Sequence, residues 1–264
     1  MALRPVRFGT SKVHSVVLEV RLLGDIRLMV GDSTVSEVDL PGPIGRHILA
    51  RLLIDPFSIG RNRLIDDVWE GQPPRSVDSV LNATLSRIRA ALRSLNLDGR
   101  DLITSSAGSV KFNRPSGTAV DFELAHHHID FAQRDLREGN PKEAARRAAI
   151  SYAISRRPLL PGIERDWLDI ERDRIQHVER RSLSLLAEVA YSSRDFDMAV
   201  QLGRELVRIA PYDERAHQRL ISALRATGNR SGAAKLEQDF VQRLEEDLGL
   251  TRGDEFFYTP ENRA

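Results

Sequence analysis

Hydrophobic and polar residues alternate along the first part of the chain, from Val16 to Leu40. The alternation is interrupted at Gly24-Asp25 and again at Gly31-Asp32, and it stops at Pro41-Gly42-Pro43. A period of two residues places apolar side chains on one face of an extended strand, and glycine–aspartate pairs are common in turns. The pattern therefore predicts three short strands in a small antiparallel sheet.

The apolar period becomes helical after this sheet. It predicts a first helix over Ile44–Leu53, a second over Asn62–Trp69 and a third over Ser76–Leu95. Asp55-Pro56 ends the first helix, because the residue before a proline is disfavoured in the helical conformation. Residues 102–112 then predict a two-stranded hairpin. A sheet, three helices and a hairpin, in this order, are typical of a winged helix with an N-terminal sheet.

The second half of the chain, after Pro115-Ser116-Gly117, has an almost purely helical pattern. The expected helices are Phe122–Glu138, Pro141–Arg156, Arg165–Ser192, Phe196–Ile209, Glu214–Thr227 and Gly232–Leu248. The stretch Arg194–Leu202 matches Gly228–Leu236 at an offset of 34 residues, with Ala199 and Ala233 in equivalent positions. Small residues recurring with this period, where two helices cross, are typical of tetratricopeptide repeats.

The expected fold class is therefore an α+β winged helix followed by an all-α, tetratricopeptide-like domain. The predicted winged helix occupies residues 16–117 and the predicted helical domain occupies residues 118–250. Residues 1–15 and 251–264 are expected to be an N-terminal and a C-terminal tail.

The third predicted helix carries the strongest functional signal. Its apolar residues form a broad inner face, and its polar residues recur at spacings that place them on the opposite side. Small hydrogen-bonding side chains toward the N-terminus allow close approach to base edges, and arginines toward the C-terminus can hold phosphates. The predicted DNA-binding residues are Arg75, Ser79, Asn82, Ser86, Arg87, Arg89 and Arg93. The alternative is an ordinary solvent-exposed helix face.

The distribution of charge supports the nucleic-acid interpretation. The whole chain has a net charge of only +1, but residues 1–118 hold 16 Lys and Arg against 12 Asp and Glu, which leaves +4. Residues 119–264 hold 23 against 26, which leaves −3. Lys111 and Arg114, on the predicted hairpin, are the expected wing cations. The basic residues are 35 Arg and 4 Lys, which can reflect a GC-rich genome but also supplies planar donors for phosphate and guanine.

Here the sequence resembles the Streptomyces antibiotic regulatory protein family of transcriptional activators. The first half resembles an OmpR-type winged helix, and the part from Phe122 onward resembles the bacterial transcriptional activator domain. The residues that carry the resemblance are Leu22-Leu23-Gly24, Ile48-Leu49-Ala50-Arg51-Leu52-Leu53, Arg63-Leu64-Ile65, Val68-Trp69, Pro73-Pro74, Leu81, Leu85-Ser86-Arg87-Ile88-Arg89-Ala90-Ala91-Leu92, Leu159-Leu160-Pro161, Trp167-Leu168, Pro211 and Leu244-Glu245-Glu246-Asp247-Leu248-Gly249-Leu250.

The resemblance implies a transcriptional activator. Members of the family bind direct repeats in promoter DNA as side-by-side protomers and recruit RNA polymerase. The loop between the second and third helices contacts the polymerase in OmpR-type relatives, which implies this role for Glu70, Gly71 and Gln72. A homodimer is also compatible with the resemblance.

The chain departs from the family pattern at three points. The wing carries Gly108–Phe112 where relatives have an aromatic tip, and Asp55-Pro56-Phe57 replaces a more polar turn. Larger relatives add an ATPase module, so the chain resembles the short form of the family or a segment of a long form.

No sequence signal supports catalysis, a cofactor or a metal site. The chain has no cysteine, no Gly-x-x-x-x-Gly-Lys-Ser/Thr run and no Gly-x-Ser-x-Gly motif. Consecutive helical side chains point about 100° apart, so His126–His128 cannot converge on one ion. Asp66, Asp67 and Glu70 are expected to form a solvated face of the second helix. The chain is therefore expected not to be an enzyme.

Two other functions remain open from the sequence. The winged helix and the repeats could form an interaction adaptor that binds only proteins, or the chain could be a sensor with a ligand pocket between its domains. No apolar run has the length of about 18 residues that a membrane span needs, and no signal peptide precedes the sheet. A cytoplasmic location without membrane contact is the expectation.

Overall fold

The computed structural model describes residues 18–249, so the two predicted tails, residues 1–15 and 251–264, lie outside the described residues. The chain divides into two compact units. The first contains the residues up to Asp121 together with Leu160–Trp167, and the second contains Phe122–Leu159 and the residues from Leu168 onward. The chain thus returns to the first unit for one short segment between two helices of the second.

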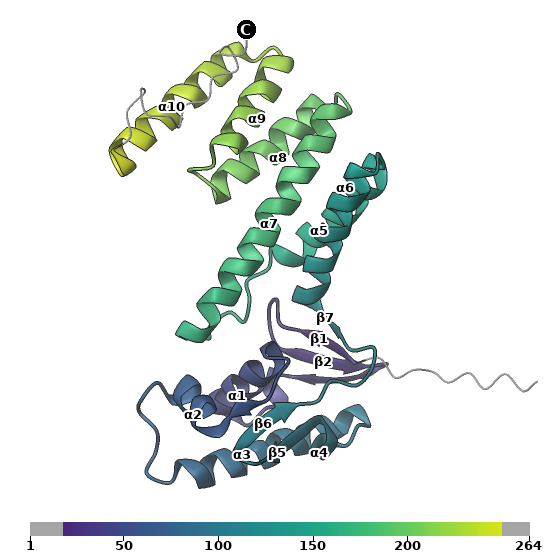
Figure 1. The fold of residues 1–264 in the computed structure, drawn as a ribbon, viewed down its shortest axis with the longest axis vertical. Helices are drawn as coiled ribbons and strands as arrows, with labels where there is room; N and C mark the ends of the chain where they lie inside the picture. The colour runs from purple at the N-terminus through teal and green to yellow at the C-terminus, as the bar shows by residue number, and fades with distance from the viewer. Residues whose placement is uncertain (1–17, 250–264) are drawn as a thin grey trace, which may run out of the picture. The chain divides into compact units, whose positions relative to one another are not determined.

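A four-stranded sheet begins the first unit (Figure 1). Its strands lie in the order β3-β2-β1-β7, and they are β1 (Glu19–Arg21), β2 (Arg27–Val30), β3 (Ser33–Ser36) and β7 (Ala119–Val120). The three predicted strands pair antiparallel, and Leu28 of β2 faces both Val20 and Val35, all three of them buried. Strand β7, which pairs parallel with β1, was not predicted.

The three predicted helices and the predicted hairpin of the first unit occur in the predicted order, with one further short strand and one further short helix between them. These elements are α1 (Gly42–Ile54), β4 (Ile59–Gly60), α2 (Arg61–Trp69), α3 (Val77–Leu92), α4 (Gly99–Leu102), β5 (Ile103–Ser106) and β6 (Ser109–Phe112). Strand β4 joins the hairpin in a sheet of order β4-β6-β5. The α-helical part of the third helix ends earlier than predicted, and Arg93–Leu95 continues as a 3₁₀ turn that stops at Asn96 in the left-handed conformation.

The hairpin closes through a turn of two residues. Ser106 of β5 pairs with Ser109 of β6, and the residues between them, Ala107 and Gly108, have φ angles of 48° and 75°. Two successive residues with positive φ make the type of turn whose twist matches that of the flanking strands. The wing is therefore a short, tightly closed hairpin.

The second unit is entirely helical within the described residues (Figure 1). Its helices are α5 (Asp121–Arg137), α6 (Pro141–Ser155), α7 (Asp166–Ser192), α8 (Phe196–Ile209), α9 (Glu214–Ala226) and α10 (Arg230–Leu248). These bounds confirm the predicted helices, all of them to within two residues at each end. None of the helices in residues 18–249 combines the length and apolar character that a membrane crossing requires.

The repeat of 34 residues is visible in the second unit. Helices α8 and α10 begin at equivalent positions, and their N-caps Asp195 and Asn229 each accept a hydrogen bond from a backbone N–H three residues later. Ala199 and Ala233 are both buried, as expected of small residues where helices cross. The cap and the small residue thus recur together, which explains why the sequence repeat corresponds to a structural one.

Candidate nucleic-acid interface

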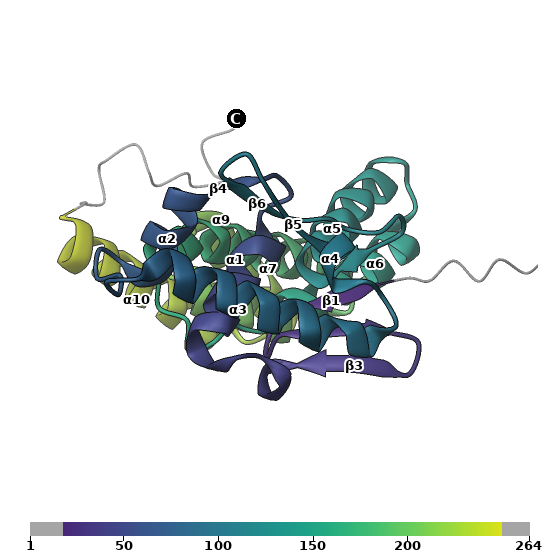
Figure 2. The same cartoon turned by 90° about the horizontal axis from the view of Figure 1, so that it is seen from below.

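Helix α3 has one buried face and one exposed face. Leu81, Leu85, Ile88 and Leu92 are at most 1 % exposed and anchor the helix in the first unit. Figure 2 shows α3 running across the front of that unit, between the end of α2 and α4. An anchored helix with a free outer side has the arrangement by which a recognition helix enters a groove of DNA.

The outer face of α3 presents most of the predicted reader residues to solvent. The exposed ones are Arg75, Ser79, Asn82, Ser86, Arg87 and Arg93. Arg75 precedes the helix, and Arg93 lies in the 3₁₀ turn that follows it. The structure therefore gathers small polar side chains and arginines on one exposed side of a rigid element. Whether these residues contact DNA stays a prediction.

Arg61, which the sequence reasoning did not single out, fixes the position of α3. Its Nε lies 2.7 Å from Asp78 Oδ1, and its Nη2 donates to the carbonyl of Asp78 and to Asn82 Oδ1, both at 3.0 Å. Its backbone N–H also donates to the carbonyl of Gly108 in the wing turn, at 2.8 Å. One arginine thus connects the start of α2, the outer side of α3 and the wing. An arginine at the start of a helix carries no sequence signal that reveals such a role.

Arg89 extends toward the wing instead of lying free on the outer face. Its Nε donates to the carbonyl of Ile103 at 2.9 Å, and its Nη2 donates to Ser105 Oγ at 3.0 Å. Burial and the nearby Arg100 lower the pKa of Arg89 from its ordinary value. The side chain therefore joins α3 to β5, and this structural role was not predicted.

Arg89→Ala is expected to lower the free energy of unfolding by about 1–3 kcal/mol, because it leaves the carbonyl of Ile103 without its charged donor. Chemical denaturation of the full chain measures this loss. Arg87→Ala is the matched control, since Arg87 is exposed and its removal should change stability by less than about 0.5 kcal/mol. Equal stabilities of the two variants would contradict the structural role of Arg89.

The two predicted wing cations occupy different environments. Lys111 lies on β6, opposite Thr104 of β5, and is partly exposed. Arg114 follows the strand, and its Nη2 donates to the carbonyl of Leu53 at 2.5 Å, in the last turn of α1. The final carbonyls of a helix lack intrahelical donors, and a cation there is favourable. Arg114 therefore stabilises the end of α1, and Lys111 remains the more accessible wing cation.

The predicted polymerase-contact loop leaves α2 through two residues with positive φ, Glu70 at 48° and Gly71 at 77°. The backbone N–H of Gln72 donates to the carbonyl of Trp69 at 2.9 Å, and Gly71 and Gln72 are exposed. Glu70 forms an ion pair with Arg165, whose Nη1 lies 3.2 Å from Glu70 Oε2. The start of the loop is thus held by a residue about a hundred positions further along the chain.

Arg165 belongs to Leu160–Trp167, a segment that packs onto the winged helix and that we call the clamp. The backbone N–H of Leu160 donates to the carbonyl of Leu22 at 2.9 Å, and Leu160 itself is buried. The clamp receives a further hydrogen bond from Arg46 Nη2, at 2.5 Å from the carbonyl of Pro161. These contacts, together with the Arg165–Glu70 pair, tie the clamp to the sheet, to α1 and to the end of α2.

Trp167 ends the clamp and contacts an ionic cluster centred on the buried Asp67 in the first unit. Its Nε1 donates to the carbonyl of Asp67 at 3.1 Å, and the guanidinium of Arg51 lies 5.3 Å from the centre of its ring. The Asp67 carboxylate accepts from Arg51 Nε at 2.7 Å and pairs with Arg63 Nε at 2.9 Å. The expectation that Asp67 is solvated is therefore wrong, because the clamp and two arginines enclose it.

The three consecutive histidines lie on α5, where His127 is exposed and both His126 and His128 are partly buried. Burial is the largest influence that lowers the pKa of His126 and of His128. No group of three or more metal-ligating side chains comes together within residues 18–249.

Comparisons with known proteins agree with the architecture. Residues 120–259 match the family model of the bacterial transcriptional activator domain. The transcriptional regulatory protein EmbR of Mycobacterium bovis and that of Mycobacterium tuberculosis are each 24 % identical over 251 residues. These alignments cover 89 % of this chain and 60 % of the relative, so the chain spans only part of the length of these regulators.

The fold has a counterpart among solved structures. Mycobacterium tuberculosis EmbR in complex with a low-affinity phosphopeptide superposes with a TM-score of 0.80 at 20 % sequence identity. The match covers 90 % of this chain and 62 % of that one. The family model covers more than half of the sequence, and it follows a winged helix, as the sequence resemblance predicts. The chain therefore belongs to the bacterial transcriptional activator domain family and has the architecture of a regulator of the Streptomyces antibiotic regulatory protein type.

Proposed function

We propose that the chain is a sequence-specific, DNA-binding transcriptional activator that reads promoter DNA with α3. The observation that carries the proposal is the exposed row of Ser79, Ser86, Arg87 and Arg93 on a helix whose other face is buried. Hydroxyl groups can bond to base edges, and arginines can bind guanine or phosphate. Lys111 on the wing would add a contact to the backbone.

The family membership supports a role in transcription, and it favours side-by-side protomers on direct repeats as the binding mode. Gly71 and Gln72 remain exposed next to α3, where they could contact RNA polymerase on the same DNA. The pairing of Glu70 with Arg165 would keep that loop in a defined position. For a protein with this proposed activity we expect a cytoplasmic location, with double-stranded DNA and RNA polymerase as partners.

Salt dependence separates DNA binding from the alternative, an adaptor that binds only proteins. Each phosphate contact contributes about −0.9 to the slope of log affinity against log salt concentration. Arg75, Arg87, Arg93 and Lys111 should therefore give a slope with a magnitude of about 3–4 for each protomer on duplex DNA. The measurement is fluorescence anisotropy with DNA fragments selected by the full chain. Absence of DNA retention at low salt would favour the adaptor.

Activation can be tested apart from DNA binding through Gln72. Gln72→Ala should keep the affinity for selected DNA and reduce transcription from a promoter that carries it, because Gln72 is exposed in the loop and lies outside the reader face. In vitro transcription with purified polymerase measures the second effect, and anisotropy titration measures the first. Full activity of this variant would remove the loop from the proposed polymerase contact.

A further inference from the structure

An arginine-rich groove runs between three helices of the second unit. It encloses about 350 Å³ and is bordered by α5, α7 and the beginning of α9. Four arginines line it, namely Arg180, Arg181, Arg215 and Arg219. The second half of the chain has a net charge of −3, so this concentration of positive charge is a local feature of the groove and not a property of the domain.

Two of the four arginines are engaged by neighbouring side chains. Arg181 Nη2 lies 2.6 Å from Asp130 Oδ1, and Arg219 Nη2 lies 3.1 Å from Glu188 Oε2. Arg180, on α7, and Arg215, on α9, make no hydrogen bond or ion pair with any side chain in residues 18–249. The groove therefore has two guanidinium groups available to an anionic partner, one on each of these two helices.

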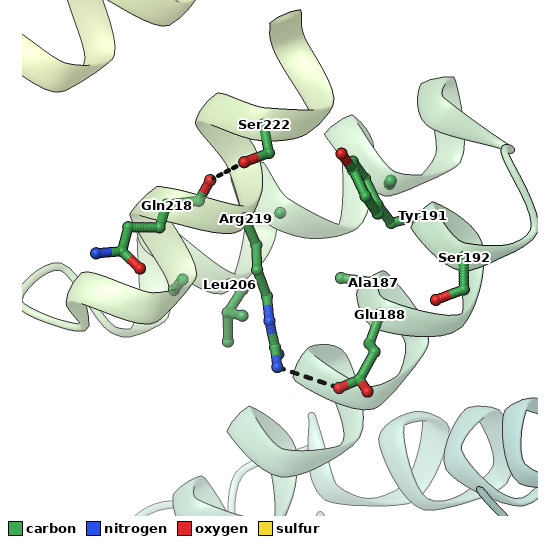
Figure 3. A pocket seen from close by; sticks show the side chains of 11 residues that line it. Ala187, Glu188, Tyr191, Ser192, Leu206, Gln218, Arg219 and Ser222 are labelled. Atoms are coloured by element: carbon green, nitrogen blue, oxygen red, sulfur yellow. Dashed lines mark hydrogen bonds and ion pairs between the residues drawn. The ribbon is translucent and has the colours of Figure 1, made fainter. Parts of the chain in front are cut away.

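A second hollow, of about 280 Å³, shares Glu188, Ala216 and Arg219 with the groove. Figure 3 shows the residues that line this second hollow. Its walls include the small residues Ala187, Ala199 and Gly203. A Cβ at Gly203 would lie 3.1 Å from Leu220 Cδ1, so the glycine allows α8 and α9 to pack closely beside this hollow. The hollow lies between α7, α8 and α9, and most of its surface is apolar.

The Glu188–Arg219 ion pair lies where the two hollows meet, and both of its residues line both of them. Figure 3 shows Arg219 reaching from α9 to Glu188 on α7, with Tyr191 and Ser192 further along α7. The side chains of the pair are 41 % and 45 % exposed, so the boundary is open to solvent. The two hollows therefore adjoin at this ion pair, with the arginine-lined groove on one side and the mostly apolar hollow on the other.

We infer that this groove binds an acidic segment of a partner protein, with carboxylates paired to Arg180 and Arg215 and one apolar side chain inserted in the hollow lined by Ala187, Ala199 and Gly203. Arginine binds carboxylates with directed, charge-assisted hydrogen bonds. A small apolar cavity beside it selects a hydrophobic side chain, which a nucleic-acid backbone does not provide.

This inference does not depend on DNA binding by α3, and its main test uses a peptide. The probe is a short fluorescein-labelled peptide in which a run of glutamates is followed by a leucine, titrated with the full chain in anisotropy measurements. Arg180→Glu and Arg215→Glu should each weaken binding by about tenfold. Arg215 is exposed, so its replacement leaves the fold intact even if that of Arg180 does not.

Matched controls isolate the groove from general charge effects. Arg204→Glu makes the same charge change at an exposed position of α8 outside both hollows, and it should leave peptide affinity unchanged. Ser222→Trp places an indole at the exposed rim of the apolar hollow. This variant should lower the affinity for the leucine peptide more than the affinity for a peptide with serine in place of leucine.

Three results would overturn the inference. The first is equal affinity for the glutamate peptide and for a peptide with glutamines in place of glutamates. The second is an equal loss of affinity with Arg204→Glu and with Arg215→Glu. The third is a loss of affinity for random-sequence duplex DNA in Arg215→Glu that is as large as the loss of affinity for the peptide. That result would indicate that the groove binds nucleic acid.

Discussion

Trp167→Ala is expected to lower the free energy of unfolding of the first unit by about 2–4 kcal/mol. This is less than the usual loss for a fully buried tryptophan, because the ring of Trp167 is only partly buried. The variant loses the packing of the indole beside Arg51 and the hydrogen bond to the carbonyl of Asp67. It also exposes the enclosed carboxylate of Asp67, whose interaction with its two arginines would then be screened by water.

The fluorescence of Trp69 measures this effect directly. The chain has two tryptophans, and both lie in the first unit, so Trp69 reports on the unfolding of that unit when Trp167 is replaced. Trp167→Phe is the control, since it keeps much of the ring contact and loses only the hydrogen bond, for a cost of about 1 kcal/mol. An unchanged denaturation midpoint in Trp167→Ala would show that the clamp does not stabilise the winged helix.

The double variant Arg87→Ala/Arg93→Ala is expected to lose affinity for promoter DNA by about 2–6 kcal/mol in total, at 1–3 kcal/mol for each arginine that contacts a base or a close phosphate. Both side chains are exposed on the outer side of α3 and its 3₁₀ extension, so their removal should leave the stability of the unit unchanged. Anisotropy titration at constant salt measures the loss.

Arg27→Ala provides the comparison for a change in charge alone. Arg27 is exposed on β2, in the N-terminal sheet. Replacing Arg27 should lower the affinity for DNA far less than replacing Arg87 or Arg93. The first unit loses the same charge in each case, but Arg27 is not expected to contact DNA. Equal losses from Arg27→Ala and Arg87→Ala would mean that the protein attracts DNA by its general charge and does not read it with α3.

The periodicity of the sequence predicted which face of α3 is buried, because the recurrence of buried positions follows directly from helical geometry. It could not predict where a long side chain on the other face would point. Arg89 follows the same spacing as exposed outer-face residues such as Ser86, yet its guanidinium reaches back to β5, and Arg114 similarly reaches the end of α1. A flexible side chain of this length finds carbonyl acceptors that only the folded chain brings near.

The packing of the clamp on the winged helix also could not be predicted from the local sequence pattern. Leu159-Leu160-Pro161 and Trp167 carried part of the family resemblance, but nothing in their immediate sequence indicates that they pack on the winged helix. The contact between Trp167 and Asp67 joins residues 100 positions apart. Strands β4 and β7 were not predicted for a related reason. Each has two residues, which are too few to show a period of two, and each is a strand only because it pairs with a neighbouring strand.

The most direct test of base reading by α3 is a selection from random duplex DNA, carried out in parallel with the wild-type chain and with the single variants Ser79→Ala, Ser86→Ala and Arg87→Ala. The wild type should enrich a direct repeat, and a variant that loses a base contact should enrich the same repeat with relaxed preference at one equivalent position of each half. Ser86 is exposed and its replacement should not disturb the fold. Identical selected sequences for the alanine variants of Ser79, Ser86 and Arg87 and for the wild type would contradict the assignment of α3 as the reader.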